Sequence, residues 1–478
     1  MGKYKYLIKN IGLLTLSSFA TKLLSFFLVP LYTSILTTEQ YGTYDLFMTT
    51  VGVLLPILTL NIQDAVLIFA LDKDYDNKTV IRIGMKYLLV SNVLVAAGLL
   101  VNNIFVFSSL GKQYAIFFFL MFLTQSLSGV ITCYIRGIDR VADLSVSSVI
   151  ASVITIGLNI IFLVYFKWGL VGYFLANIIG PLVQSIYLAI RANVHIDTLR
   201  KDNTAIESNG NVTPKVLEKK MTDYSKPLIA NALAWWVNNA SDRYVVIFFC
   251  GLAANGVYSV ASKIPSILNI FQTIFNQAWT LSAVKDFDPN DESGFFAKTY
   301  RTYNCLMTIV CSMIIVFDKI LAKILYAQNF YDAWKYVPWL TIAILFGAMS
   351  GYIGGFFSAV KNSKVFAIST VVGAISNIVL NIIFTPVIGP MGAAIATTIS
   401  YGEVFFIRFF QSRKYIKLKI NVVRDVCSYI LLIIQAIALC TIENQIFMYG
   451  VIIGLFLVVV VCYVADMKLV LSKLVHRK

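Results

Sequence analysis

Charge is scarce in this 478-residue chain. Charged residues make up 13% of it, whereas a soluble domain has about 25%. Hydrophobic residues make up 58%, and the mean hydropathy is +0.78. Water could not solvate a surface of this composition, so the sequence predicts an integral membrane protein and excludes a soluble one.

Histidine is almost missing, and the cysteines form no motif. The chain has two histidines and seven cysteines, without a Cys-x-x-Cys spacing or a histidine cluster. Metal and disulfide chemistry are therefore not expected, and the thiols are interpreted as small apolar side chains. No G-x-x-x-x-G-K-[ST] sequence is present, so nothing indicates the use of ATP. We expect neither a cofactor nor a metal.

Long apolar runs fill the rest of the chain, and each is long enough for a helix that crosses a bilayer. They are too long and too continuous for the strands of an outer-membrane barrel. The fold class predicted is an all-α polytopic membrane protein with about 14 transmembrane helices. The expected spans are 10–36, 43–70, 84–107, 114–135, 143–166, 169–191, 226–250, 256–284, 300–317, 336–360, 364–385, 390–410, 424–441 and 446–465.

Lysine and arginine set the orientation of these spans. Most of the 39 basic residues fall in one alternating set of connecting segments, which includes both ends of the chain. The positive-inside rule therefore places both termini in the cytoplasm. It also accounts for the net charge of +15, so no nucleic-acid partner is expected.

The chain repeats itself. Residues 158–162 and 380–384 both read Leu-Asn-Ile-Ile-Phe, and flanking residues match in the same register. Two similar halves are typical of transporters. We expect an N-terminal six-helix lobe (1–191), a cytoplasmic linker (192–225), a C-terminal six-helix lobe (226–412) and two further transmembrane helices (413–478). The pentapeptide carries no charge and lies outside the polar spans, so it is interpreted as scaffold.

Ionisable residues inside spans are functional candidates, because each costs about 2.5–3.5 kcal/mol to place at mid-bilayer on insertion scales. The bases Lys22, Arg243 and Lys263 are expected to contact an anionic substrate. The acids Asp64, Asp242 and Glu403 are candidates for ion coupling. The alternative is that such residues pair with neighbouring helices and only hold the bundle together.

Polar residues recur at helical spacing beside these charges. We expect them to line a water-filled cavity between spans 1, 2, 7 and 8, because lipid or an apolar core would not support such stripes. The expected lining residues are Asn231, Asn238, Ser259, Ser266, Asn269, Thr273 and Gln277.

Two segments carry a family resemblance. Residues 29–46 (VPLYTSILTTEQYGTYDL) and 324–338 (ILYAQNFYDAWKYVP) resemble polysaccharide flippases, the Wzx-type O-antigen and capsule branch of the multidrug/oligosaccharidyl-lipid/polysaccharide exporter superfamily. The resemblance implies two six-helix lobes that work by alternating access in the bacterial cytoplasmic membrane.

The resemblance also implies a cargo and partners. The cargo is an oligosaccharide on undecaprenyl pyrophosphate, moved from the cytoplasmic to the outer leaflet for surface polysaccharide assembly. Membrane lipid, H⁺ or Na⁺, and polysaccharide polymerase and assembly proteins are the other expected partners. Such a protein is a transporter and not an enzyme.

Two alternatives remain open at this point. A cation-coupled multidrug antiporter of the same superfamily would need acidic residues to dominate the cavity, whereas bases do so here. A membrane glycosyltransferase or polymerase would need a large external loop with catalytic acids, and the longest loop of this chain is expected in the cytoplasm.

Overall fold

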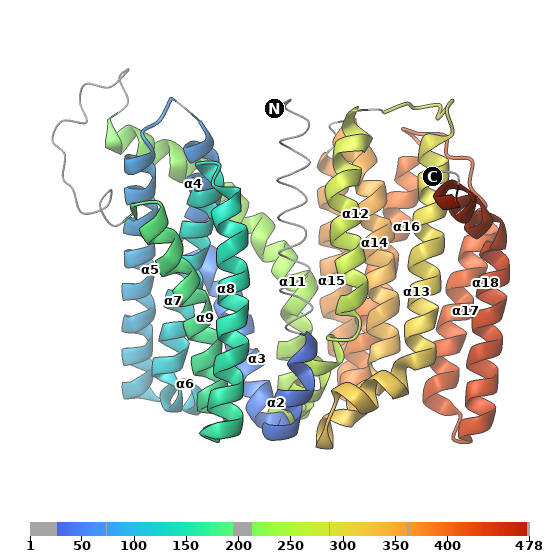
Figure 1. Ribbon diagram of the computed structural model, residues 1–478, viewed down its shortest axis with the longest axis horizontal. Coiled ribbons are helices and arrows are strands. Elements are labelled where there is room, and N and C mark those ends of the chain that lie inside the picture. The colour runs from blue at the N-terminus through green and yellow to red at the C-terminus, as the bar shows by residue number, and fades with distance from the viewer. Residues whose placement is uncertain (1–25, 73, 195–212, 286, 361–362, 476–478) are drawn as a thin grey trace. The chain divides into compact units, whose positions relative to one another are not determined.

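The computed structural model describes residues 26–72, 74–194, 213–285, 287–360 and 363–475, apart from some side chains in α11, α12, α15 and α18 (Figure 1). These residues form helices and no strand, as the composition predicts. Contacts between residues divide the chain after Trp236 into two compact units.

The first unit contains eight described helical segments and the beginning of a long ninth. Its core lies between α4, α5 and α7, where Ile62, Val66, Val80 and Ile131 are almost completely buried. The segments are α2 (Val29–Ile35), α3 (Thr38–Leu58), α4 (Ile62–Leu71), α5 (Asn77–Phe105), α6 (Ser109–Gln113), α7 (Ala115–Gly137), α8 (Val141–Asn159) with its π-helical continuation η1 (Ile160–Tyr165), α9 (Gly169–Arg191) and the first part of α11 (Pro214–Ala261).

The second unit contains the rest of α11 and the remaining helices. Helix α14 lies at its centre and packs against α12, α13, α15, α16 and α17. The segments are α12 (Ser266–Lys285), α13 (Phe295–Leu325), the 3-10 helix η2 (Gln328–Lys335), α14 (Val337–Ala359), α15 (Ser363–Ile388), α16 (Pro390–Ser412), α17 (Val422–Thr441) and α18 (Gln445–Val475).

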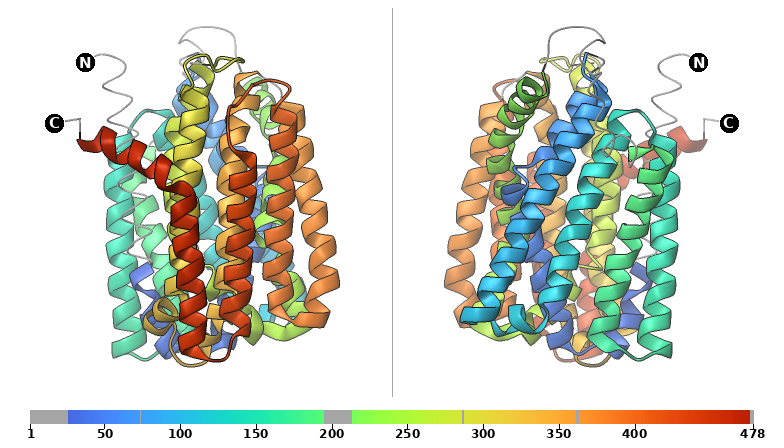
Figure 2. Two further views of the ribbon diagram at one scale, coloured as in Figure 1. Left: turned by 90° about the vertical axis from the view of Figure 1, so that its right-hand side faces the viewer. Right: turned by 90° about the vertical axis from the view of Figure 1, so that its left-hand side faces the viewer.

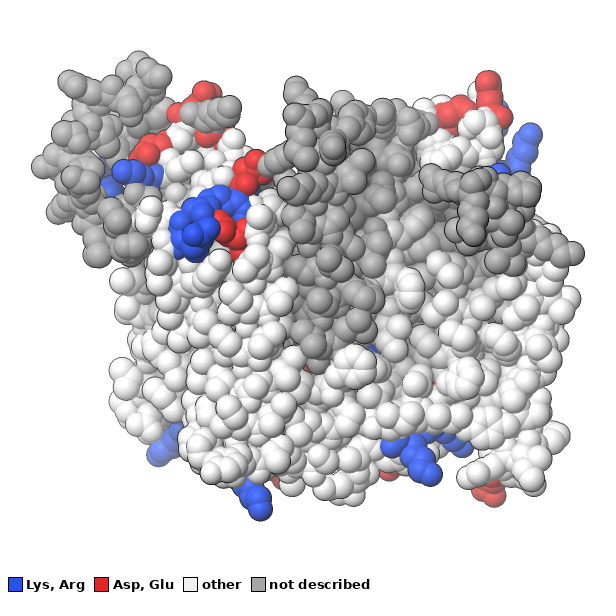
Figure 3. Space-filling model, in the orientation of Figure 1, with Lys and Arg blue, Asp and Glu red and all other residues white. Residues whose placement is uncertain are grey.

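Twelve of the described helical stretches are long and apolar enough to cross a membrane, so the chain is a multi-pass integral membrane protein. Helix α12 is long enough but more polar, and most of the expected span 10–36 lies outside the described residues. On the face drawn in Figure 3, Lys, Arg, Asp and Glu gather at the ends of the helices and leave a broad uncharged band between them.

The sequence repeat corresponds to one packing contact made in both units. A Cβ atom at Gly172 of α9 would lie 2.9 Å from the Cβ of Phe162, and one at Gly392 of α16 would lie 2.5 Å from the carbonyl carbon of Phe384. These phenylalanines end the two copies of the pentapeptide. The helix pairs α8–α9 and α15–α16 are therefore equivalent. The π-helix η1 lies where the first copy has two extra residues, and wider turns of this kind accommodate insertions.

Both predicted spans 43–70 and 256–284 are interrupted in the structure. The first breaks between α3 and α4, where Leu60 and Asn61 have φ angles of 52° and 51°. The second breaks at residues 262–265, a turn that precedes α12 and includes Pro265. Hydrophobic and polar periodicity did not reveal these breaks, because each one preserves the run of apolar residues on both sides.

Helices α17 and α18 run side by side in the second unit (Figure 2, left) and are joined to α13 by ion pairs. Arg424 of α17 pairs with Asp425 at 3.0 Å and also with Asp466 of α18, while Arg301 of α13 pairs with Asp466 at 3.5 Å. These ion pairs therefore hold α17 and α18 against α13.

Neutral polar side chains extend this connection along α13. Asn304 donates to the hydroxyl of Tyr463 at 3.0 Å and accepts from the hydroxyl of Tyr429 at 2.8 Å. Two turns further on, Ser312 donates to Gln435 at 2.8 Å. All five side chains are buried. Each one provides a hydrogen-bond partner that the surrounding lipid could not provide.

Candidate functional site

The candidate site is a buried polar cluster in the second unit around Asp242. Helix α11 changes direction at Gly251, where φ is 85°, so Asp242 lies before the kink and Tyr258 after it. Tyr258 donates to Oδ2 of Asp242 at 2.6 Å, and the backbone N–H of Arg243 donates to Oδ1 at 2.9 Å. The aspartate is 9% exposed and the tyrosine 3% exposed, so this is a short, charge-assisted bond shielded from solvent.

A second polar contact joins α15 to α16. Asn381 of α15 donates to Oδ1 of Asn377 at 3.1 Å, and Asn377 donates to Oγ1 of Thr397 and to Oγ of Ser400 on α16, both at 3.2 Å. All four side chains are buried.

The chemistry of the cluster favours a small cation of single charge. It contains one carboxylate and the neutral hydroxyl of Tyr258. Among the described residues, no group of three or more His, Cys, Asp or Glu could hold a metal ion. A divalent ion would find too little negative charge at Asp242, whereas H⁺ or Na⁺ would be matched by one carboxylate.

The predicted lining residues nearest to this cluster are placed as follows. Asn238 lies one turn before Asp242 and donates to the carbonyl oxygen of Thr370 at 3.4 Å, and Ser259 follows Tyr258 and is buried. Arg243 is half-buried on α11. The structure thus gathers Asn238, Asp242 and Arg243 on consecutive turns of one helix.

The other predicted residues of the second unit follow the break in span 8. Lys263 lies in the turn before α12 and is half-buried, as are Ser266 and Asn269, whereas Thr273 is exposed. Thr273 donates to the carbonyl oxygen of Asn269 at 2.8 Å. The polar stripe expected on one continuous helix is therefore divided between a turn and a helix.

Four predicted residues lie either in the first unit or outside the described part of the chain. Asn231 is exposed on the part of α11 in the first unit. Asp64 lies in the first turn of α4 and accepts from Asn61 at 2.6 Å. Lys22 and the side chain of Gln277 lie outside the described part of the chain.

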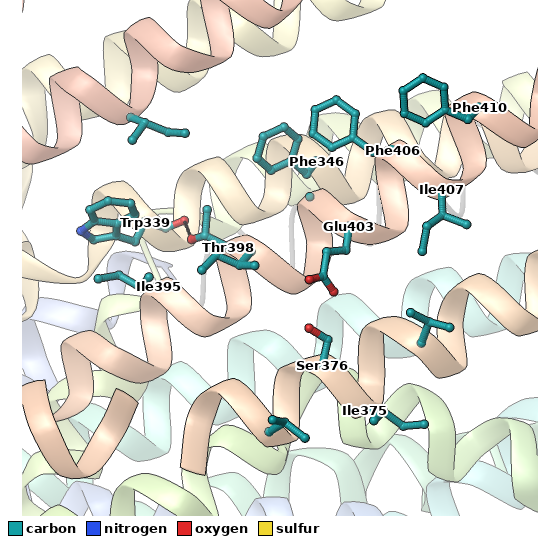
Figure 4. A pocket seen from close by; sticks show the side chains of 15 residues that line it. Trp339, Phe346, Ile375, Ser376, Ile395, Thr398, Glu403, Phe406, Ile407 and Phe410 are labelled. Carbon is teal, nitrogen blue, oxygen red and sulfur yellow. Dashed lines mark hydrogen bonds between the residues drawn. The ribbon is translucent and has the colours of Figure 1, made fainter. Parts of the chain in front are cut away.

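Glu403 lies in a separate apolar groove of about 1060 Å³ on the second unit, formed by α14 to α17. Its carboxylate and the hydroxyl of Ser376 point toward one another across this groove (Figure 4). Aliphatic and aromatic side chains form most of the remaining wall, among them Ile395, Phe346 and Phe410. Glu403 and Asp242 therefore lie in very different surroundings.

Arg408 is a buried cation that sequence analysis missed. It lies near the end of the expected span 390–410, where it was counted with the basic residues of the cytoplasmic side. It is 3% exposed and donates to Ser369 at 2.9 Å, to Thr370 at 2.8 Å and to the carbonyl oxygen of Ser350 at 3.2 Å. In the first unit, the equivalent serine, Ser147, accepts from the neutral amide of Gln184 at 3.3 Å. A charge thus replaces an amide in the second half of the repeat.

Asn377 and Asn381 form a buried polar contact that sequence analysis also missed. Asn381 belongs to the repeated pentapeptide, which was interpreted as scaffold. The contact between Gly392 and Phe384 fits that interpretation, and Asn381 also donates to Asn377, which in turn joins α15 to α16. An uncharged residue in a repeat gives no sequence signal of this second role.

Comparisons with known proteins agree with this fold. The sequence model of a family described as "Polysaccharide biosynthesis protein" matches residues 7–280, and no curated protein matches the chain. The structure of "Lipid II flippase MurJ, inward closed conformation" is similar over 96% of this chain and 99% of its own, with 15% identity and a TM-score of 0.70.

Two other solved transporters share the architecture. An inward-facing "multidrug resistance MATE family transporter of the MOP superfamily" is similar over 82% of this chain and 94% of its own, with 16% identity and a TM-score of 0.65. A MOP superfamily transporter from Pyrococcus furiosus is similar over 85% of this chain and 95% of its own, with 16% identity and a TM-score of 0.52. At these identities the likeness establishes the fold.

Proposed function

The chain belongs to the family of polysaccharide biosynthesis proteins, and we propose that it is a flippase for lipid-linked oligosaccharide. The cargo would be an oligosaccharide on a polyprenyl pyrophosphate, carried from the cytoplasmic to the outer leaflet of a bacterial cytoplasmic membrane. The family match over residues 7–280 is the observation that carries this proposal. The fold shared with a lipid II flippase supports it.

The cationic residues support an anionic headgroup. A pyrophosphate diester carries about two negative charges, and burying them unpaired in hydrocarbon would be prohibitive. Arg243 and Lys263 are half-buried bases within the membrane-spanning part of the chain, and Lys22 is a third base in the sequence. Charge-assisted hydrogen bonds from such side chains would offset the loss of water around the phosphates.

The membrane potential would favour outward transport of this cargo. Moving two negative charges outward across a membrane with an inside-negative potential of about 100 mV releases about 4–5 kcal/mol, if the bases of the protein do not move with them. We infer that the potential, together with a coupled cation, supplies the direction.

The Asp242 cluster is the proposed coupling site. A proton on Asp242 would turn Oδ2 from an acceptor into a donor, and Tyr258 could then no longer donate to it. A bound Na⁺ would likewise require oxygen lone pairs where the hydroxyl hydrogen now lies. Either ion would break the bond between Tyr258 and Asp242, so that ion occupancy changes the contact between the parts of α11 before and after Gly251.

Cells that lack the protein separate this proposal from a drug antiporter. We expect deletion to trap lipid-linked oligosaccharide on the cytoplasmic leaflet and to deplete surface glycan. Unchanged surface glycan with increased drug sensitivity would instead support the multidrug antiporter.

Substitution of the bases tests the contact with the headgroup. We expect Arg243→Ala and Lys263→Ala to abolish surface glycan while the protein remains in the membrane. Lys335→Ala is the matched control, because Lys335 pairs with the exposed Asp332 at 2.8 Å on η2. Full export by the Arg243/Lys263 double variant would refute the role of these bases.

Proteoliposomes test the driving force. Net transport of lipid-linked oligosaccharide is expected to fall when the potential and the ion gradients are both collapsed. Unchanged net transport under these conditions would refute the coupling.

A further inference from the structure

Asp318 is a carboxylate with unusual surroundings. It lies in α13, about two turns before the helix ends at Leu325, and its exposed fraction is 0%. Neither of its carboxylate oxygens accepts a hydrogen bond from any described residue. The basic residues place this end of α13 on the outer side of the membrane.

The other buried aspartates of the second unit all accept hydrogen bonds or form ion pairs. Asp291 accepts from the backbone N–H groups of Phe296 and Ala297 at 2.9 and 2.8 Å. Asp242 accepts from Tyr258, and both Asp425 and Asp466 pair with Arg424. Within the described residues, Asp318 is thus the buried aspartate whose two oxygens both lack a donor.

The neighbouring base does not neutralise Asp318. The ammonium group of Lys319 lies 3.2 Å from the sulfur of Met448 and 4.3 Å from the ring centre of Trp334. It forms no ion pair with Asp318 in the described structure. Packing against α18 and η2 therefore holds the lysine away from the carboxylate.

Among the described side chains, no other element that packs against α13 brings a cation into contact with Asp318. The titratable groups that would interact electrostatically with an ionised Asp318 are Tyr331 of η2, Cys440 of α17 and Tyr449 of α18. Lys335 of η2 is paired with Asp332, and α14 contains no charged residue. The charged residue of α12, Lys285, is at the opposite end of that helix from the break near Lys263.

We propose that Asp318 is a proton-binding site at the outer end of the second unit. An ionised carboxylate in this position would cost several kcal/mol, because it has lost water and gained neither a donor nor a counterion. A neutral carboxylic acid avoids most of that cost. Asp318 holds H⁺ while α13, η2, α17 and α18 are packed together, and it releases H⁺ when these elements separate and water reaches it.

This site is distinct from the Asp242 cluster and does not depend on the identity of the cargo. Asp242 accepts from the Tyr258 hydroxyl and from the backbone N–H of Arg243, whereas no described residue donates to Asp318. The two aspartates are therefore suited to opposite states, one ionised and one protonated.

Infrared spectroscopy of the full-length protein in lipid tests the proposal directly. We expect a carbonyl band of an undissociated carboxylic acid at neutral pH, lost in Asp318→Asn and retained in Asp332→Asn, the matched control on the exposed side of η2. A band that is unchanged in Asp318→Asn would overturn the proposal.

A second measurement uses stability. The folded protein would hold a proton that the unfolded chain releases above about pH 4. As the pH rises, the unfolding equilibrium constant of the wild type relative to Asp318→Asn should increase about tenfold per pH unit while the folded carboxyl stays protonated. A ratio that is independent of pH would overturn the proposal.

The wild-type spectrum remains decisive if Asp318→Asn does not fold. The absence of any undissociated carboxyl band at neutral pH would refute the site. A band that persists in Glu403→Gln would support it, because Glu403 is the other carboxylate in apolar surroundings.

Discussion

The bond between Tyr258 and Asp242 should account for a measurable part of the stability of the second unit. Tyr258→Phe removes a hydroxyl that donates to a carboxylate at 2.6 Å and leaves the ring in place. A hydrogen bond to a charged group contributes about 1.5–3 kcal/mol. We therefore expect the unfolding equilibrium constant to rise by a factor of about 10 to 150.

A double-mutant cycle separates this bond from the packing of the ring. In the Asp242→Asn background the same hydroxyl meets a neutral amide oxygen, where a hydrogen bond contributes only about 0.5–1.5 kcal/mol. The two substitutions should therefore be coupled by about 1–2 kcal/mol. Equilibrium unfolding in detergent micelles measures all four proteins. Losses that add to within about 0.5 kcal/mol would refute the reasoning.

Tyr303→Phe is the matched control for this experiment. Tyr303 is as buried as Tyr258, but its hydroxyl has no hydrogen-bond partner in the described structure. Removing an unsatisfied hydroxyl should leave the stability unchanged or increase it. A loss at Tyr303 equal to that at Tyr258 would mean that the assay detects ring packing alone.

Three further results are expected. Gly392→Ala should destabilise the protein by about 1–3 kcal/mol, because its Cβ would lie 2.5–2.7 Å from backbone atoms of α15, whereas Gly450→Ala meets nothing within 4 Å and should be tolerated. Glu218→Gln should cost about 0.2–1 kcal/mol at neutral pH. The hydrogen bond from Lys86 holds the pKa of Glu218 below its usual value, so this stabilisation is present at neutral pH and disappears as the pH falls through that lowered pKa; a loss that is the same in acid would contradict the pair. A membrane-soluble carbodiimide should label the wild type at Glu403, and Glu403→Gln should remove that label from the α16 peptide.

Composition and periodicity predicted the fold because membrane insertion imposes simple requirements on a sequence. Each span needs about 20 apolar residues, and the positive-inside rule orders the loops. The repeat added the register that makes α8–α9 equivalent to α15–α16, and the contacts at Gly172 and Gly392 bear this out. The breaks before α4 and α12 were not predicted, because a short turn changes direction without interrupting an apolar run.

Part of the candidate site could be predicted from the sequence, and the limits have a physical cause. Intramembrane charge identified Asp242 as a candidate, since a carboxylate is costly in a bilayer wherever it lies. Tyr258 was not identified, because a neutral tyrosine costs little in a membrane helix and occurs in many of them. Its contact with Asp242 depends on the kink at Gly251, and spacing along the sequence does not contain that information.

The polar contacts of α13 bear on how the length of such proteins can change. A shorter relative that ended after α16 would leave the counterparts of Asn304 and Ser312 facing lipid, since α17 and α18 supply their partners. Helix loss and substitution at these two positions would therefore have to occur together. Apolar residues there are expected in twelve-helix chains and polar ones in fourteen-helix chains, which gives a way to count helices from one segment of sequence.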